Sequence, residues 1–321
     1  MTVKNPPKVA ILDDYLRVAE SLADFRRLPP GSEFVVFDRH ITDRDELIAA
    51  LRPFDVIVAM RERTRFPAAL IENLPNLRLL VTTGARNAAI DLAACRARGI
   101  TVSGTRSAGT PTAELTWGLI LALVKRIPAE DKALRLGVWQ TGLTEGLAGK
   151  RLGLVGLGKL GTQVARVGHA FGMEVVAWSP NLNDTRAKAA GAKRVEKAAL
   201  FGTADVVSLH LVLGERTRGI VGVEELSTMK PSAFLINTSR AGLVDMDALL
   251  GVLDAKRIAG AGLDVFPEEP VSPKHPLLGL PNVVLTPHLG YVTRENFAVY
   301  YRDALEDILA WHAGAPLRLI A

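Results

Sequence analysis

Short apolar runs alternate with amphipathic segments through the first hundred residues. Because the apolar runs are continuous rather than alternating, we expect strands that are buried on both faces. The segments 43–51 and 90–98 have the spacing of helices, and Gly99 stands where a helix C-cap belongs. This βαβ repeat predicts a parallel sheet covered by helices. The expected strands are Lys8–Leu12, Glu33–Phe37, Asp55–Ala59, Arg78–Val81 and Ile100–Val102.

The alternation is interrupted once and then restarts. Thr110, as an N-cap, and Pro111, at the first helical position, open a long apolar helix that runs to about residue 126. Strand-like runs return from residue 151, and the amphipathic segment 293–312 predicts a closing helix. The pattern therefore predicts an α/β protein with two doubly wound parallel sheets. The strands expected in the second sheet are Leu152–Gly156, Glu174–Trp178, Asp205–Leu209, Ala233–Asn237, Ile258–Leu263 and Val283–Leu285.

Composition limits the class of protein. A length of 321 residues suits two domains, and 48% hydrophobic with 23% charged residues is the balance of a folded chain. The longest apolar stretch, 115–124, is shorter than the ~20 residues that span a bilayer. With a single cysteine, Cys95, and no signal-peptide pattern in the first eight residues, we expect a cytoplasmic protein without a membrane segment. The net charge of +5 comes from scattered residues, which fits an anionic cofactor and substrate and not a nucleic acid.

A glycine-rich loop connects the first expected strand of the second sheet to a helix. Gly156, Gly158 and Gly161 fit the pattern G-x-G-x-x-G. In dinucleotide-binding folds the first glycine permits a tight turn, the second lets the backbone approach a pyrophosphate, and the third allows close packing of helix and strand. The helix N-terminus then offers free N–H groups to the phosphates. The loop predicts a site for NAD or NADP, with a purely structural glycine turn as the alternative.

The residue that follows strand 174–178 bears on the choice between NAD and NADP. An acidic residue usually stands there and holds the ribose hydroxyl of NAD, but this chain has Ser179, with Asn181 close behind. The missing carboxylate removes repulsion of a 2′-phosphate, while the missing adjacent arginine removes its usual attraction. Arg186 lies further along the chain. The sequence leaves the choice open, with NAD slightly favoured.

Three polar residues follow successive expected strands of the second sheet: Arg240, Glu269 and His288. Carboxyl ends of parallel strands meet at one edge, so we expect the three side chains to converge. A guanidinium grips a carboxylate and a carbonyl oxygen together, and an imidazole donates a proton near neutral pH, which a neighbouring carboxylate favours. The set predicts the reduction of a small 2-oxo acid. Taken singly, each residue fits a surface salt bridge or a structural histidine equally well.

The remaining candidates for chemistry are weaker. His210 ends the strand 205–209, and we expect it to line the cofactor cleft. Cys95 lies in an expected helix without a recognisable partner, so a catalytic thiol is not expected. No zinc-type spacing, nucleophile elbow or Walker loop is present, and we expect no metal.

From residue 41 to residue 312 the ordered motifs resemble the D-isomer-specific 2-hydroxyacid dehydrogenase family. The resemblance implies that His288 protonates the carbonyl oxygen, that Glu269 sustains its charge, and that Arg240 orients the substrate carboxylate. It also implies that Thr238 and Asp264 hold the nicotinamide end of the cofactor. The matching segments are 156–161, 229–231, 237–240, 263–266, 269–270 and 286–288.

The same resemblance extends to the pyrophosphate and the substrate. It implies that backbone amides of Lys159 and Leu160 hold the pyrophosphate, and that the substrate is bound by the loop 83–91, with Ala85 and Arg86, and by Arg61. It further implies a homodimer. The implied fold has a Rossmann dinucleotide-binding domain, 106–287, inserted into a flavodoxin-like substrate domain made of 1–105 and 288–321.

The chain departs from the family pattern at several places. Arg86 replaces a common valine or glycine, Val212 stands where proline is frequent, and Tyr291 replaces a smaller residue after His288. Two alternatives remain. A formate or oxyanion dehydrogenase is similar but typically carries glutamine at the position of Glu269, and a co-repressor-like NAD(H)-sensing protein retains the same motifs.

Overall fold

The computed structural model describes residues 5–320, which form two compact units. Unit 1 combines the chain up to residue 109 with the chain from residue 293 onward, and unit 2 is the continuous segment Thr110–Val292. Unit 2 is therefore inserted between the two parts of unit 1. This division leaves His288 in unit 2, whereas the family resemblance begins the second part of the substrate domain at that residue.

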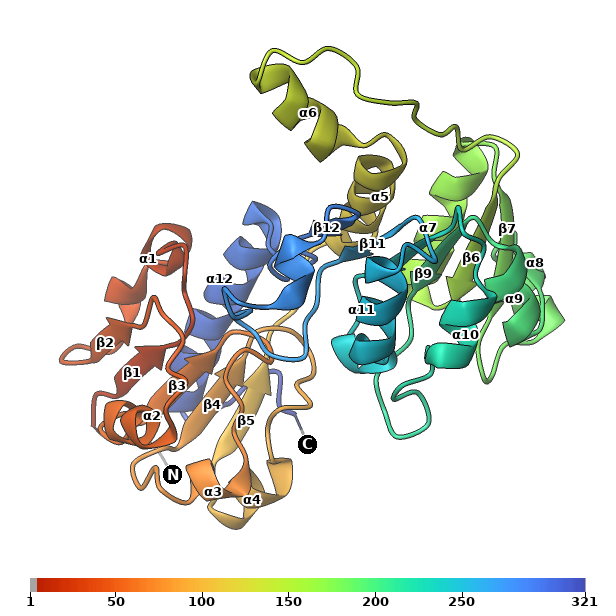
Figure 1. Cartoon of the computed structure of the whole chain (residues 1–321). Helices are drawn as coiled ribbons and strands as arrows, with labels where there is room; N and C mark the ends of the chain where they lie inside the picture. The colour runs from red at the N-terminus through yellow and green to blue at the C-terminus, as the bar shows by residue number, and fades with distance from the viewer. Residues whose placement is uncertain (1–4, 321) are drawn as a thin grey trace. The chain divides into compact units, whose positions relative to one another are not determined.

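Unit 1 is a five-stranded parallel sheet in the order β2-β1-β3-β4-β5 (Figure 1). This is the flavodoxin-like strand order expected for a doubly wound sheet. Each predicted strand is present to within two residues. The strands are β1 (Lys8–Ile11), β2 (Glu33–Val36), β3 (Val56–Ala59), β4 (Leu79–Thr82) and β5 (Thr101–Gly104).

Burial of the unit 1 strands follows their place in the sheet. The central strands β3 and β4 are buried at every position. The prediction of burial on both faces is wrong for β2, which alternates exposed and half-buried residues because it lies at the sheet edge; Val35 is 45% exposed. Helix α12 contacts α1 and β4. The helices are α1 (Ala19–Leu22), α2 (Arg44–Leu51), α3 (Ala68–Ile71), α4 (Leu92–Ala97) and α12 (Arg294–His312).

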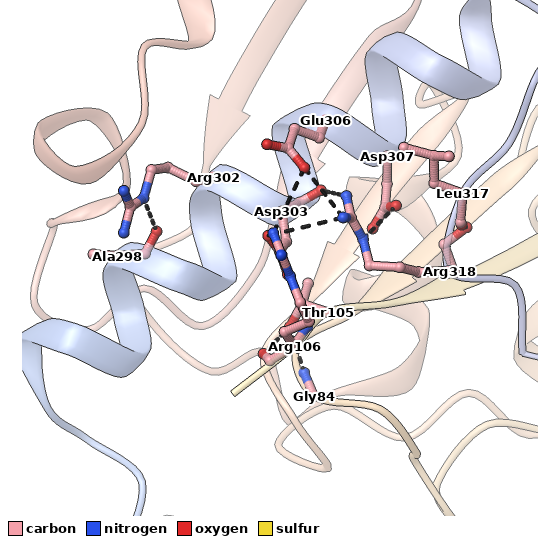
Figure 2. Close-up of polar contacts among 11 residues, drawn as sticks. Gly84, Thr105, Arg106, Ala298, Arg302, Asp303, Glu306, Asp307, Leu317 and Arg318 are labelled. Carbon is pink, nitrogen blue, oxygen red and sulfur yellow. Dashed lines mark hydrogen bonds and ion pairs between the residues drawn. The ribbon is translucent and has the colours of Figure 1, made fainter. Parts of the chain in front are cut away.

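A polar network fixes the chain of unit 1 just before it crosses into unit 2 (Figure 2). Asp303 of α12, only 2% exposed, accepts hydrogen bonds from the backbone N–H of Arg106 at 2.8 Å and from its guanidinium at 2.7 and 3.0 Å. Burial of Asp303 tends to raise its pKa, but the hydrogen bonds and the charge of Arg106 hold that pKa below its usual value. This carboxylate therefore ties the end of β5 to the last helix.

The same helix anchors the C-terminal segment. Arg318 donates to Asp307 at 3.0 Å and to the carbonyl oxygen of Asp303 at 2.8 Å (Figure 2). Burial raises the pKa of Asp307 to about 7 in spite of the neighbouring Arg318 charge. Beyond Arg318, the N–H of Ile320 donates to the carbonyl of Val102 in β5. The two parts of unit 1 are thus joined by a strand-like pairing as well as by α12.

Unit 2 is a seven-stranded parallel sheet in the order β12-β11-β10-β9-β6-β7-β8 (Figure 1). Counted from β6, this is the Rossmann order 3-2-1-4-5-6 with one further strand at its end. The six predicted strands are all present, and the two-residue β8 was not predicted. The strands are β6 (Arg151–Val155), β7 (Glu174–Trp178), β8 (Lys193–Arg194), β9 (Val206–Leu209), β10 (Phe234–Asn237), β11 (Gly260–Leu263) and β12 (Val283–Leu285).

Two apolar clusters cover the unit 2 sheet. One contains Trp117 and Ile120 of α5 with Val164 of α7, and the other contains Phe201 of α9 with Leu249 of α11. The apolar helix predicted from Pro111 is α5, whose apolar surface contacts β10, β11, β12 and α7. The helices are α5 (Pro111–Val124), α6 (Ile127–Arg135), α7 (Lys159–Ala170), α8 (Asp184–Ala189), α9 (Lys197–Thr203), α10 (Val223–Thr228) and α11 (Met246–Asp254).

Helix α6 was not predicted and has no buried residue. The segment that follows it also exposes large apolar side chains. Within residues 5–320, no helix has the length and apolar character needed to cross a membrane. The exposed apolar side chains are Ile127, Leu134, Leu136, Val138, Trp139 and Leu143.

Candidate active site

Two glycines of the G-x-G-x-x-G loop are required by packing. Gly156 follows β6 with φ +105°, and a Cβ there would lie 2.6 Å from the carbonyl oxygen of His210. A Cβ on Gly161 would lie 2.3 Å from the carbonyl oxygen of Gly156. Both distances are far below a van der Waals contact. A side chain on Gly161 would push α7 away from the turn after β6, and a side chain on Gly156 would clash with the backbone that follows β9.

Gly158 differs from its two neighbours in the loop. It is the N-cap of α7, its backbone is extended, and a Cβ placed on it would meet nothing within 4 Å. Packing therefore does not require a glycine here, whereas close approach of a phosphate to the backbone does. The first N–H groups of α7, from Lys159 and Leu160, have no partner within the helix and carry its positive end. The loop fits the pyrophosphate of a dinucleotide.

Replacing Gly158 by alanine is expected to weaken NADH binding by about tenfold or more, because the new methyl occupies the space a pyrophosphate needs. Fluorescence titration with NADH measures this effect. The melting temperature should stay close to that of the wild type, since the methyl meets no protein atom. Gly161→Ala is the matched control and should instead lower the melting temperature. Unchanged NADH affinity in Gly158→Ala would contradict a cofactor site at this loop.

The other side chains assigned to the cofactor are held by neighbours within unit 2. The His210 ring lies 2.9 Å from the Ser208 hydroxyl, and burial lowers the pKa of His210 to about 4. Thr238, which follows β10, pairs its hydroxyl with that of Thr116 in α5 at 2.8 Å. Ser179 follows β7 and is partly exposed. His210 is therefore neutral at physiological pH and is not a candidate acid.

Arg240 is placed by a tight turn after β10. The Asn237 side chain donates to the Arg240 carbonyl at 3.0 Å and accepts from the Ser239 N–H at 3.0 Å. The Ser239 hydroxyl donates to the carbonyl of Leu211 at 2.6 Å, and the Arg240 guanidinium donates to the carbonyl of Ser239 at 2.7 Å. These bonds wind the chain so that the arginine stands at the carboxyl end of the sheet.

Glu269 and His288 form a direct pair. The Nδ1 atom of His288 lies 2.6 Å from Oε2 of Glu269, and the side chains are 20% and 28% exposed. The other oxygen, Oε1, accepts from the N–H of Phe266 at 2.9 Å. Burial opposes ionisation of Glu269, but the bond and charge of His288, with the charge of Arg240, hold its pKa below the usual value. The pair leaves Nε2 of His288 for a substrate.

Asp264 holds the loop that carries His288. Its Oδ1 accepts from the Thr286 hydroxyl and from the Leu289 N–H, both at 2.6 Å, and its Oδ2 accepts from the Gly290 N–H at 2.9 Å. Burial raises the pKa of Asp264 against these bonds. The structure thus shows this carboxyl group supporting the loop, and the nicotinamide role implied by the resemblance stays a prediction.

Comparison with known proteins shows the family. Residues 117–290 match the model of the D-isomer specific 2-hydroxyacid dehydrogenase NAD binding domain. A glyoxylate reductase from Aeropyrum pernix is 36% identical over 84% of this chain and 83% of its own length. The chain belongs to the D-isomer specific 2-hydroxyacid dehydrogenase family. It is accordingly an oxidoreductase of the 2-hydroxyacid dehydrogenase type with an NAD binding domain.

Two further relatives extend the comparison. The chain is 35% identical to a D-3-phosphoglycerate dehydrogenase from Archaeoglobus fulgidus over 86% of its residues, but it matches only 53% of that longer protein. A crystal structure of a phosphoglycerate oxidoreductase from Vibrio cholerae superposes with a TM-score of 0.91 at 40% identity, covering 96% of this chain and all of that one. The family fold therefore extends through both units.

Besides Arg240 of unit 2, the residues that the resemblance assigns to the substrate lie in unit 1. Arg61 follows β3 with φ +52°, and one guanidinium nitrogen occupies the space where Gly84 would carry a Cβ, at 1.8 Å. Ala85 and Arg86 follow β4 and are exposed. The Asn87 side chain donates to the Arg61 carbonyl at 2.6 Å, so the two loops are fixed to each other. All three residues stand at the carboxyl edge of the unit 1 sheet.

Three features of the family site were not predicted from the sequence. The turn made by the Asn237 side chain is one, although asparagine before a turn is a recognisable signal. The support of Glu269 by the Phe266 N–H is another, and no local pattern indicates it. The third is the contact of Tyr291 with the His288 ring.

Among residues 5–320, no group of three or more His, Cys, Asp or Glu side chains is arranged to hold a metal ion.

Proposed function

We propose that the chain reduces a small 2-oxo acid to the D-2-hydroxy acid, with His288 as the acid, Glu269 as its partner and Arg240 as the carboxylate clamp. The observation that carries the proposal is the 2.6 Å contact between His288 and Glu269. Arg240, at a neighbouring strand end, is close enough to stabilise the Glu269 charge. A proton donor, its carboxylate and a cation thus stand at one edge of one sheet.

Each residue of the site has a defined task in this proposal. When bound, the reduced nicotinamide supplies the hydride. His288 gives the Nε2 proton to the carbonyl oxygen, and Glu269 stabilises the imidazolium through Nδ1. Arg240 binds the substrate carboxylate with its planar donors. The amides of Lys159 and Leu160 bind the pyrophosphate, with Thr238, Asp264 and His210 beside the nicotinamide end.

For the cofactor we propose that NAD is preferred and NADP is accepted. No carboxylate follows β7 to repel a 2′-phosphate. The adjacent arginine that usually attracts a 2′-phosphate is missing as well, since the nearest one along the chain, Arg186, donates to the carbonyl of Asn181 at 3.3 Å. Equal catalytic efficiency with NADPH and NADH would contradict the preference.

We propose that unit 1 supplies the substrate-binding loops and that unit 2 is the dinucleotide-binding domain. Arg61, Ala85 and Arg86 would contact the substrate. The relatives are named for glyoxylate, hydroxypyruvate and phosphoglycerate, which supports a substrate of two or three carbons. In this proposal backbone amides of the loop after β4 bind the substrate carboxylate, and an inward Arg86 would favour a second anionic group.

We further propose a cytoplasmic homodimer. The exposed apolar side chains of α6 and residues 136–143 form a surface of the kind that monomers rarely leave open, and a second copy of the chain would cover it. Cys95 is buried and free, which fits a reducing compartment. Light scattering of the purified chain measures the oligomeric state.

A spectrophotometric screen tests the proposed reaction. NADH and NADPH oxidation would be followed with glyoxylate, hydroxypyruvate, pyruvate, phenylpyruvate and longer 2-oxo acids. Reduction of NAD⁺ and NADP⁺ would be followed with formate. We expect turnover of at least one short 2-oxo acid and none of formate. If NADH binds but no 2-oxo acid is reduced, the chain is a nucleotide-sensing protein of the same fold instead.

Replacing Glu269 by glutamine is expected to move the alkaline limb of the pH profile of kcat/KM to lower pH. Because the charges of His288 and Glu269 stabilise each other, loss of the carboxylate makes the imidazolium release its proton more easily. Reduction needs that proton, so activity is lost at a lower pH. The acidic limb should move little. Steady-state rates between pH 5 and 10 measure both limbs.

The neighbouring Glu268 provides the matched control. It is exposed, and Glu268→Gln removes the same charge one residue away from the pair. Its pH profile should match that of the wild type. An alkaline limb in Glu269→Gln that coincides with the Glu268→Gln limb would exclude the proposed partnership of Glu269 and His288.

A further inference from the structure

Tyr291 stands against the imidazole of His288. The two ring centroids are 5.3 Å apart and the ring planes meet at 77°, which is an edge-to-face arrangement. This geometry is the favoured one for aromatic pairs. Tyr291 is 8% exposed, so its ring is part of the packed interior and not a mobile surface group. The two residues are three positions apart on the loop that follows β12.

The backbone around the two rings is fixed at almost every position. The Gly290 carbonyl accepts from the Thr112 hydroxyl of α5 at 2.7 Å, and the N–H of Val292 donates to the Leu289 carbonyl at 2.9 Å. A Cβ on Gly290 would lie 3.0 Å from the carboxylate of Asp264 and 3.2 Å from Thr112, so the space around this glycine is tight. These bonds fix the backbone on both sides of Tyr291, and the ring itself is packed in the interior.

The backbone of His288 itself has an unusual conformation, which the bonds of the surrounding loop help to stabilise. Its φ is +53°, a conformation that non-glycine residues rarely adopt. The bond from Nδ1 to Glu269 fixes one atom of the ring, but it still allows the ring to swing about that bond. A flat ring packed against the imidazole removes this remaining freedom. The two contacts together determine where Nε2 lies.

From this geometry we propose that Tyr291 is a positioning residue for proton transfer: its ring holds the His288 imidazole so that Nε2 keeps the orientation in which it delivers a proton. The inference rests on the proposed role of His288. Glu269 fixes the ring at Nδ1, and Tyr291 fixes the ring plane. Misplacing a catalytic group costs rate even when binding is unchanged, because proton transfer needs a near-attack geometry.

The test compares Tyr291→Phe, Tyr291→Leu and Tyr291→Met with the wild type. Phenylalanine keeps the ring, while leucine and methionine fill the space without an aromatic face. We expect Tyr291→Phe to keep kcat within about twofold. The leucine and methionine variants should lose about three- to tenfold in kcat, the range of one aromatic contact, with KM and NADH affinity nearly unchanged. The solvent deuterium isotope effect on kcat should rise in both.

These readouts separate positioning from stability. A merely structural tyrosine would lower the melting temperature and leave the isotope effect and the ratio of kcat to KM as they are. Wild-type kcat in both aliphatic variants would overturn the inference, and so would a phenylalanine variant as slow as leucine. If Tyr291→Leu does not fold, Tyr291→Met, which repacks more easily, decides the question.

A further variant keeps this inference distinct from the proposed function. His288→Asn removes the proton donor itself. Wild-type activity in His288→Asn would reject the assignment of His288, and the tyrosine would then have no catalytic ring to position. Loss of activity in His288→Asn together with full activity in both aliphatic Tyr291 variants would reject the positioning role alone.

Discussion

Replacing His288 by alanine is expected to reduce kcat/KM for 2-oxo acid reduction by about a hundredfold or more. A positioned acid contributes about 10²- to 10⁴-fold to such a step, and His288 is the acid that the Glu269 carboxylate contacts, at 2.6 Å. NADH affinity should change little, because the glycine loop of α7 does not contact the imidazole. Steady-state kinetics and NADH titration measure the two effects.

The backbone of His288 decides which variant is the cleaner one. With φ +53°, this position strains alanine, whereas asparagine adopts the left-handed conformation more readily. His288→Asn can also keep a hydrogen bond to Glu269 but cannot transfer a proton at neutral pH. We therefore expect both variants to be equally inactive, with a higher melting temperature for His288→Asn. Turnover close to that of the wild type in His288→Asn would remove the residue from the mechanism.

Replacing Arg240 by alanine is expected to lower kcat/KM by about a hundredfold or more, with a rise in KM as well as a fall in kcat. Loss of a bidentate charge-assisted contact to the substrate carboxylate raises KM, and the carbonyl group is then no longer oriented for the reaction, which lowers kcat. Arg240→Lys should recover only part of the loss, because an ammonium group does not reproduce the planar pair of donors. Full kinetics at saturating NADH distinguish the two parameters.

Arg257 offers a control of equal charge. It is exposed and precedes β11, at the amino edge of the sheet, opposite to the site. Arg257→Ala should leave both kinetic parameters unchanged. A similar KM in Arg240→Ala and Arg257→Ala would mean that the arginine after β10 does not bind the substrate.

Much of the fold is predictable from this sequence. The continuous apolar runs gave each strand to within two residues, because burial between two helical layers admits little else. The glycine spacing located the dinucleotide loop for the same reason, since Gly156 and Gly161 have no room for a side chain. Strand ends then placed Arg240, Glu269 and His288 at one edge. Apolar runs, glycine spacing and strand ends are all properties of the local sequence, so they can be predicted without the tertiary structure.

What the sequence does not show depends on contacts between distant segments. Helix α6 is amphipathic, but none of its residues is buried, so it adds nothing to the core of unit 2 and was not predicted. The edge position of β2 follows from the strand order and not from its own residues. Asp264 received a cofactor role from the family resemblance, whereas its three bonds to residues 286–290 arise only when two strands lie side by side. Pairings of this kind need the tertiary structure.

The placement of α12 has a consequence for synthesis on the ribosome. Residues 110–292 emerge as one uninterrupted segment, so unit 2 holds all of its strands before α12 has been made. The first part of unit 1 is synthesised before unit 2, and its second part is synthesised after it. Until then α1 and β4 lack their contacts with α12, and β5 lacks the pairing of Ser103 with Leu319. A nascent chain therefore carries an uncovered apolar sheet face for the time needed to translate the whole insertion, and this face is where a chaperone would bind.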